Sequence, residues 1–388
     1  MTTWDVLIIG AGPAGCSAAW TASSAGLKTL VVEEHPNVGE PVHCGECLSE
    51  TALNRLPKKP PSSVFSRSVK GIRAIFPAGI ARNVTEPGYV LEKHLFEGWL
   101  AKEAQDVGAE VRTNSRLTRI SRNSGIWQAE IGNSKEEARI VIDASGVQSV
   151  VSRLISLNER SKTVVGIQYE MKGIEVGEYL DFYLWPHLAP HGYLWVIPKS
   201  GGRANVGLVT DDNTNAKKYL DNFIAEIGLE GKGIVKTFGG LIPAGGPVSR
   251  TFSDGVMVVG DAAGFTSPLF EGGTALGMKS GEIAAKVAFD ALSANDTSKA
   301  RLSFYEAGWR KEFPPYEKIL AGKNMLYSLQ ESELSRLAGL LPVEMGSLSA
   351  WDKVTTGLRI LFSSPKNFPK ALPAFKALGY SRAHSYGW

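Results

Sequence analysis

The sequence predicts an α/β protein with a Rossmann-like dinucleotide-binding domain, an inserted antiparallel-sheet domain and a C-terminal helical region. Residues 4–34 read as a buried strand, a glycine turn, a helix of small residues and a second strand that ends in an acid. Two later buried strands run into the tight turns D-A-S-G at 143–146 and G-D-A-A-G at 260–264. Aromatic-rich strands occupy residues 163–210 between these turns. Alternation of this kind is typical of α/β folds with an added sheet.

The N-terminal unit has the residue order that dinucleotide binding requires. Gly10 permits a tight turn, Gly12 lets backbone N–H groups approach a pyrophosphate, and Gly15 lets the helix pack closely on the strand. Glu33, 18 residues beyond Gly15, is placed to accept ribose hydroxyls. We therefore predict a dinucleotide at the N-terminus of this helix. The alternative is a glycine-rich turn in an ordinary βαβ unit.

Length and composition limit the class of protein. The 388 residues suffice for two domains or one large composite domain. Lys plus Arg number 42 against 39 acids, and this net charge of +3 predicts no nucleic-acid partner. Three cysteines fit a reducing compartment and exclude a disulfide framework. We expect no targeting peptide, no membrane span and a cytoplasmic location.

The loop after the second strand contains Cys44 and Cys47 at C-x-x-C spacing. Zinc is a poor fit because there is no second cysteine pair and the histidines are scattered, so we expect no metal. A redox disulfide would need a thiol of lowered pKa. The alternatives are a loop of small residues passing a planar ring, or two buried thiols that only pack.

Strands and one helix are predicted between residues 69 and 142. The ranges are strands at 69–76 and 81–91, a helix at 92–107, strands at 109–113 and 116–121, and a hairpin at 127–131 and 138–142. The last strand runs into Asp143 and a tight turn. Ligands bind at such strand ends in α/β proteins.

Aromatic side chains are dense between residues 163 and 210. They are Tyr169, Tyr179, Phe182, Tyr183, Trp185, Tyr193 and Trp195. This density fits a sheet that holds a flat or apolar ligand, and it fits plain core packing equally well. A helix at 215–227 and a strand at 234–238 complete this region.

A buried strand returns at Gly255 and leads to a long helix at 273–291. Asp261 lies just past the strand, where an acid can hold a sugar or polyol hydroxyl. The turn at 271–274 opens the helix and directs backbone N–H groups at an anion. The alternative for Asp261 is an exposed helix cap.

The C-terminal region from Ser298 is helical and ends in a basic, aromatic segment. Residues 353–388 contain six Lys or Arg and no acid. Seven large apolar side chains are interleaved with them: Leu361, Phe362, Phe368, Phe375, Tyr380, Tyr386 and Trp388. Such a segment either rests on an anionic membrane surface or covers the protein as a solvated layer.

The glycine unit with Glu33, D-A-S-G and G-D-A-A-G together resemble the FAD-dependent oxidoreductases of the glutathione reductase and p-hydroxybenzoate hydroxylase type of fold. Within them, P-V-H-C-G-E-C at 41–47, Y-L-W-V-I-P-K at 193–199 and S-P-L-F-E-G-G-T at 267–274 resemble the geranylgeranyl reductase family. That family includes archaeal digeranylgeranylglycerophospholipid reductases and chlorophyll-pathway enzymes. The resemblance covers about residues 1–310.

The resemblance implies FAD as the cofactor. Ala14 and Glu33 would touch the adenosine half, and Leu117 would offer its backbone to the adenine. Lys93 stands where the family has the arginine of R-x-x-F-D, so a planar fork is replaced by a point charge. Asp261 would bond the ribityl or pyrophosphate region. Five residues would lie along the flavin ring: Cys44, Gly45, Cys47, Gly273 and Thr274.

The implied reaction is saturation of geranylgeranyl chains of a lipid, in membrane lipid biosynthesis. An unactivated double bond is a poor hydride acceptor, so an acid must stand near it. Cys44 and Glu46 are the candidates that the sequence places by the flavin. Four residues would form the wall of an apolar tunnel for the lipid: Tyr193, Trp195, Ile197 and Pro198.

The domains expected from this resemblance are discontinuous. Residues 1–60, 92–155 and 250–297 would form the FAD-binding domain, residues 61–91 and 156–249 the substrate-binding sheet domain, and residues 298–388 the C-terminal helical region, with peripheral membrane contact on the inner face. The chain has no second glycine-rich βαβ unit. An external electron donor, reduced ferredoxin or transient NAD(P)H, is therefore expected.

Two other functions fit the same cofactor. A flavin monooxygenase or halogenase shares the fold, and W-V-I-P at 195–198 resembles part of a halogenase motif, although Tyr193 replaces its first tryptophan. A flavin-bearing lipid or electron carrier without turnover is the third hypothesis.

Overall fold

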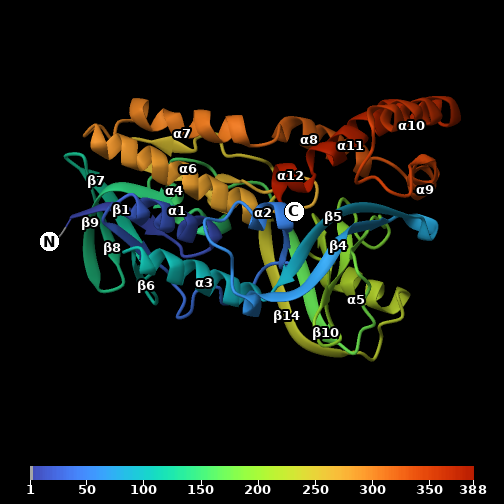
Figure 1. The fold of residues 1–388 in the computed structure, drawn as a ribbon, viewed down its shortest axis with the longest axis horizontal. Helices are drawn as coiled ribbons and strands as arrows, with labels where there is room; N and C mark the ends of the chain where they lie inside the picture. The colour runs from blue at the N-terminus through green and yellow to red at the C-terminus, as the bar shows by residue number, and fades with distance from the viewer. Residues whose placement is uncertain (1–2) are drawn as a thin grey trace.

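The computed structural model describes residues 3–388, and within this range the strands form two eight-stranded sheets (Figure 1). The first sheet has the order β15-β16-β9-β1-β2-β6, and the β7–β8 hairpin joins it through β9. Its strands are β1 (Thr3–Ile9), β2 (Thr29–Val32), β6 (Glu110–Arg112), β7 (Leu117–Asn123), β8 (Ile126–Ile131), β9 (Ser134–Asp143), β15 (Phe252–Ser253) and β16 (Val256–Val258). β1 pairs in parallel with β2 and β9, and its apolar residues from Val6 to Ile9 are buried.

Helices α1 (Pro13–Ser24), α3 (Lys93–Asp106) and α6 (Thr274–Ser293) pack on this sheet (Figure 1). The contact between α1 and α6 is very close, because a Cβ on Gly281 would lie 2.1 Å from the Ala14 carbonyl oxygen. Glycine and alanine at the crossing let the two helix backbones touch. The long helix of small residues predicted at 273–291 is confirmed by α6.

The second sheet has the order β14-β10-β13-β12-β11-β4-β5-β3 and is mainly antiparallel. Its strands are β3 (Cys47–Ser49), β4 (Phe65–Ile75), β5 (Ala81–Leu91), β10 (Thr163–Lys172), β11 (Leu180–Tyr183), β12 (Tyr193–Lys199), β13 (Arg203–Thr210) and β14 (Gly233–Pro243). β14 is longer than the predicted strand at 234–238, because it pairs with β10 along its full length. Helix α5 (Ala216–Glu226) covers one face through Leu220 and Phe223.

Short helices α2 (Glu50–Leu53) and α4 (Val150–Leu154) complete the two-sheet body. α2 is shorter than the helix predicted at 49–56, since Ser49 ends β3 and caps the helix through the N–H of Ala52. The C-terminal helices are α7 (Lys299–Glu312), α8 (Tyr316–Tyr327), α9 (Glu331–Leu340), α10 (Ala350–Ser363), α11 (Phe368–Tyr380) and α12 (Ala383–Tyr386). In Figure 1, α7 and α8 lead to α9 and α10 at the end of the molecule opposite β1.

None of the helices between residues 3 and 388 is both long and apolar enough to cross a lipid bilayer. The twenty-residue α6, the longest of them, is instead packed against α1 inside the protein. The helical character predicted for the chain after Ser298 is confirmed.

Candidate functional site

The turn between β1 and α1 has the conformation that the sequence predicted. Gly10 has a φ of +102°, and a Cβ there would lie 2.4 Å from the Ala144 carbonyl oxygen. A Cβ on Gly15 would lie 1.9 Å from the Gly10 carbonyl oxygen. Glycine is thus required at both positions, one for the turn and one for the close packing of α1.

The N-terminus of α1 is open to an anion. Gly12 is the N-cap and provides no side chain to bond the first N–H groups, and Pro13 follows at the first helical position. A Cβ on Gly12 would meet no atom within 4 Å, so this glycine faces open space. Free N–H groups and the helix dipole favour a phosphate here.

Glu33 lies at the end of β2 beside this turn. Its Oε2 accepts a hydrogen bond from the Ala11 N–H at 3.0 Å, and its Oε1 accepts from the His35 N–H at 3.0 Å. The carboxylate is thereby fixed at the mouth of the turn, as a ribose-binding acid must be.

A cavity of about 890 Å³ extends from this turn along the ends of the parallel strands. Five predicted cofactor residues line it: Gly10, Gly12, Glu33, Leu117 and Asp261. Its size and its glycine-lined phosphate end fit a dinucleotide. Ala14 and Gly15 serve the packing of α1 instead, since the Ala14 side chain lies against Gly260 and Gly277. Contact of their backbone with a cofactor stays a prediction.

Asp261 belongs to the turn that follows β16 and lies at the far end of the cavity. Burial raises the pKa of its carboxyl to about 6, against the lowering effect of the Lys93 charge. A Cβ on Gly273 would lie 3.2 Å from Asp261 Oδ1, so the start of α6 adjoins this acid. The exposed-cap alternative does not fit its place in the cavity wall.

The Lys93 side chain pairs with an acid of its own helix. Its Nζ bonds Glu97 Oε1 at 2.5 Å within α3, and its backbone N–H donates to Glu46 Oε1 at 3.0 Å. Its charge still reaches Asp261 through space. A direct contact of Lys93 with the cofactor stays a prediction.

A second cavity of about 120 Å³ lies between the Cys44–Cys47 loop, β12 and the start of α6. It brings together eight predicted residues: Cys44, Gly45, Glu46, Cys47, Tyr193, Trp195, Gly273 and Thr274. Ile197 also lines it, and a Cβ on Gly45 would lie 3.1 Å from Ile197 Cδ1. The loop of small residues therefore packs against the aromatic strand with room for a flat group beside it.

The two thiols of the loop are free. Burial, with help from Cys44 and Glu46, raises the pKa of the Cys47 thiol well above its ordinary value. A reactive redox cysteine needs the opposite shift. The geometry therefore favours the interpretation of this loop as a wall of small residues.

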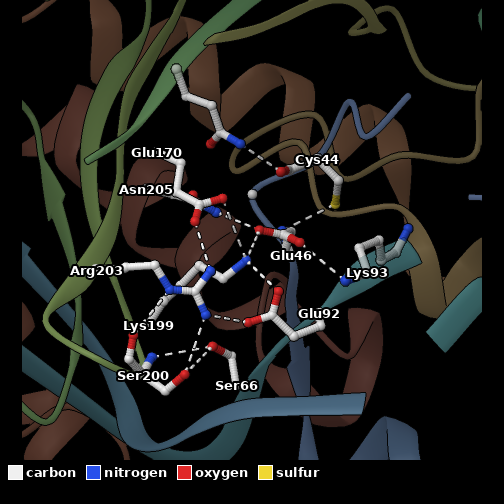
Figure 2. A network of polar contacts seen from close by, with 12 residues as sticks. Cys44, Glu46, Ser66, Glu92, Lys93, Glu170, Lys199, Ser200, Arg203 and Asn205 are labelled. Carbon is white, nitrogen blue, oxygen red and sulfur yellow. Dashed lines mark hydrogen bonds and ion pairs between the residues drawn. The ribbon is translucent and has the colours of Figure 1, made fainter. Parts of the chain in front are cut away.

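Glu46 holds the loop through a buried ion cluster, shown in Figure 2. Its Oε2 accepts from Lys199 Nζ and from Asn205 Nδ2, both at 2.7 Å. The side chains of Glu46 and Lys199 are each only 2% exposed. All of the Glu46 carboxylate is thus bonded to donors, which suits positioning of the loop better than supply of a proton.

Three further residues complete what we term the anchor cluster. Lys199 Nζ lies 3.2 Å from Glu92 Oε2, and Arg203 bonds Glu92 and Glu170 at 2.7 Å each (Figure 2). The anchor cluster consists of Glu46, Glu92, Glu170, Lys199, Arg203 and Asn205. It ties the loop to the start of α3 through Glu92 and to β10, β12 and β13. No sequence pattern predicts this cluster, because its members are far apart along the chain.

The wall predicted for a substrate is formed in part. Tyr193, Trp195 and Ile197 line the smaller cavity. Pro198 is not among the residues that line this cavity, since alternate residues of β12 face opposite sides of the sheet, and a contact of Pro198 with substrate stays a prediction. Phe182 and Phe270 were not predicted as lining residues and lie in the same wall.

The C-terminal aromatic residues do not all lie on one exposed surface. Tyr386 is 1% exposed, and both it and Trp388 line the smaller cavity. A Cβ on Gly88 would lie 2.2 Å from the Trp388 ring. Placing Tyr386 and Trp388 on a membrane-facing surface is therefore wrong, because they pack inward. Phe362, by contrast, is 79% exposed.

Among residues 3–388, no group of three or more His, Cys, Asp or Glu side chains is arranged to hold a metal ion.

Two family patterns match the chain. The pattern described as FAD dependent oxidoreductase matches residues 5–153, and that described as Geranylgeranyl reductase catalytic domain matches residues 163–242. The first range contains the glycine turn and Glu33, and the second contains the aromatic strands.

Curated relatives match over nearly the whole chain. The digeranylgeranylglycerophospholipid reductase 2 of Methanothermobacter thermautotrophicus is 35% identical, over 95% of this chain and 98% of its own length. The digeranylgeranylglycerophospholipid reductase of Methanosarcina acetivorans is 34% identical, over 92% of this chain and 96% of its own length.

Solved structures share the fold. A geranylgeranyl bacteriochlorophyll reductase-like protein from Thermoplasma acidophilum superposes with a TM-score of 0.87 at 32% identity, covering 96% of this chain and all of that one. A flavin-dependent brominase superposes with a TM-score of 0.73 at 17% identity, covering 97% of this chain and 99% of that one, a likeness of fold alone.

Proposed function

Because this chain belongs to the geranylgeranyl reductase family of FAD-dependent oxidoreductases, we propose that it saturates the isoprenoid chains of a glycerophospholipid. The observation that carries the proposal is that two cavities adjoin, since His43 and Leu241 line one and their chain neighbours Cys44 and Ile242 line the other. One has a glycine-lined phosphate end, and the other is walled by Phe182, Tyr193, Trp195 and Phe270. A cofactor that spans the first would present its ring to the second.

The described residues fit FAD. Gly10, Gly12 and Glu33 would hold its adenosine and phosphate half, and Asp261 its ribityl hydroxyls. The ring would lie among residues of the smaller cavity: Cys44, Gly45, Cys47, Gly273 and Thr274. When bound and reduced, FAD supplies a hydride. The chain must orient the double bond, exclude water and give a proton. Electrons would come from an external donor, reduced ferredoxin or NAD(P)H.

Mass analysis of the lipid tests the function. The holoenzyme, photoreduced without oxygen, is incubated with digeranylgeranyl glycerophospholipids of several head groups. We expect a gain of two hydrogens for each double bond. Unchanged lipid with every head group would contradict the proposal. Oxygen-dependent NADPH consumption with an aromatic compound would instead indicate a monooxygenase or halogenase.

The first prediction concerns FAD binding and pH. Without cofactor, Asp261 has a pKa of about 6, so it is protonated at pH 5 and ionised at pH 7. The ionised carboxylate is the stronger acceptor of hydrogen bonds from ribityl hydroxyls, so below this pKa we expect FAD binding to be coupled to release of the proton. We expect FAD affinity to be about tenfold lower at pH 5 than at pH 7. Fluorescence titration measures it, and Asp261→Asn should flatten the dependence. An unchanged slope in Asp261→Asn would contradict this role.

We also propose that α10 rests on an anionic membrane surface. Five apolar side chains on this helix are exposed: Trp351, Val354, Leu358, Leu361 and Phe362. Their spacing puts them along one side of the helix, and Lys353, Arg359 and Lys366 beside them are exposed too. Contact would be peripheral, on the inner face, and would bring the apolar cavity near its lipid.

The second prediction tests this surface. Trp351 is 73% exposed, so Trp351→Ser with Phe362→Ser should remove the two largest groups that enter the lipid without unfolding the protein. We expect at least tenfold weaker partitioning onto anionic vesicles, since each side chain contributes on the order of 1.5 kcal/mol when buried. Vesicle sedimentation measures it. Phe304→Ser on α7, also at an exposed position, is the control. Equal loss in the control would contradict a surface confined to α10.

A further inference from the structure

Glu271 is a buried acid in the smaller cavity, and none of the roles proposed so far involves it. It lies two residues before Gly273, in the turn that opens α6, with a φ of +48°. Its side chain is 3% exposed and lines the cavity together with Cys47 and Tyr193. The left-handed backbone turns this side chain into the protein. A second carboxyl group, besides that of Glu46, therefore stands in a wall that is largely aromatic and aliphatic.

Only one of its two oxygens is satisfied. Oε1 accepts a hydrogen bond from Lys323 Nζ of α8 at 2.8 Å, whereas Oε2 is buried and has no hydrogen-bond partner. Buried polar atoms are nearly always paired. An unpaired carboxyl oxygen on a residue that lines a substrate cavity is thus left to bond or protonate a bound molecule.

Burial disfavours the charged form of the Glu271 carboxyl. Burial raises the pKa of Glu271 above its ordinary value, although Lys323 and Tyr193 act to lower it. Tyr327 of α8 also faces it, and Tyr193 donates its hydroxyl to the Phe270 carbonyl oxygen at 2.8 Å. Tyr193 and Tyr327 have pKa values raised by burial, so both stay neutral. Lys323 is the cation that would stabilise the carboxylate after proton loss.

We propose that Glu271 is the acid that protonates the double bond of the lipid, an assignment that rests on the proposed function. The Glu271 O–H bond breaks and a C–H bond forms at one alkene carbon. The other carbon takes a hydride, which reduced FAD would supply when bound, so the alkene would be reduced and the flavin oxidised. Glu271 is left as a carboxylate beside Lys323 and regains its proton from solvent. Glu46, bonded to three donors, is free for none of these steps.

The third prediction is a pH profile. The acid must be protonated, so single-turnover reduction by the wild type should fall as pH rises through the pKa of Glu271. Glu271→Gln should lower the rate about a hundredfold or more and remove this alkaline limb. Glu271→Asp should restore part of the rate and the limb. Lys323→Met removes the cation that lowers the pKa, so the limb should move to higher pH. Glu317→Gln, exposed on α8, should match the wild type.

A second readout needs no turnover. Infrared pH titration of the cofactor-free protein should reveal a carboxyl group that ionises above the range of ordinary glutamates, absent in Glu271→Gln and shifted upward in Lys323→Met. A wild-type rate and limb in Glu271→Gln would overturn the assignment alone. A wild type inactive toward every lipid would overturn the proposed function and the assignment with it. If Glu271→Gln fails to fold, the pH profiles of single-turnover reduction by Glu271→Asp and Lys323→Met test the assignment instead.

Discussion

Gly15→Ala should destabilise the protein by about 3 kcal/mol and leave it without bound FAD. The new methyl carbon would lie 1.9 Å from the Gly10 carbonyl oxygen and 3.1 Å from its carbon. Neither backbone atom can move without opening the turn, because Gly10 is itself packed closely on Ala144, whose carbonyl oxygen would lie 2.4 Å from a Cβ built on Gly10. α1 must therefore lift away from β1, and its N-terminus with it. Urea unfolding and flavin absorbance of the purified protein measure the two effects.

Two matched variants separate packing from ligand contact. Gly98→Ala, in α3, meets no atom within 4 Å and should be neutral or slightly stabilising. Gly12→Ala also meets open space, so it should fold normally but bind FAD more weakly, because the methyl group occupies the approach of the pyrophosphate. A stable, yellow Gly15→Ala protein would contradict the tight contact.

Lys199→Met should have a similarly large effect, a loss of about 3–5 kcal/mol of stability. Methionine fills the space, but Glu46 loses its Lys199 partner, while Glu92 and Glu170 keep Arg203. Adding Glu46→Gln to Lys199→Met should recover part of the loss, since one buried charge is then removed. The midpoint of urea unfolding measures both. Cofactor retention should fall as well, because Glu46 holds the loop that borders the flavin site.

The control for this variant is Lys70→Met. Lys70 pairs with Glu178 at 2.6 Å, but both side chains are more than half exposed, so water replaces the lost contact. Its unfolding midpoint should equal that of the wild type. A wild-type midpoint in Lys199→Met would show that the anchor cluster does not stabilise the loop.

The N-terminal unit could be predicted from sequence because its signal is local. Gly10, Gly12, Gly15 and Glu33 act within one βαβ unit, and the structure places all four as expected. The resemblance to the geranylgeranyl reductase family is likewise confirmed, through motifs that each lie within a few residues. Residues that lie close together in the sequence and act within one βαβ unit are compatible with few alternative structures.

Contacts between distant segments could not be predicted in this way. Glu271 meets Lys323 across 52 residues, and Glu46 meets Lys199 across 153. In the sequence, Glu271 is only the first residue of the turn at 271–274 that opens the helix. In the last 36 residues, composition alone could not separate Phe362, which is exposed, from Tyr386, which is buried, because only tertiary packing decides which aromatic face is covered.

The order of strands in the first sheet has a consequence for biosynthesis. β9 is complete at Asp143, but the neighbour of its last residues, β16, begins at Val256. While the ribosome makes the intervening hundred or so residues, this edge of β9 has no partner, and the face that α6 will cover stays bare. A nascent chain in this state presents unpaired backbone groups and apolar side chains, the features that chaperones recognise. The parallel sheet therefore closes late, after the antiparallel sheet has emerged.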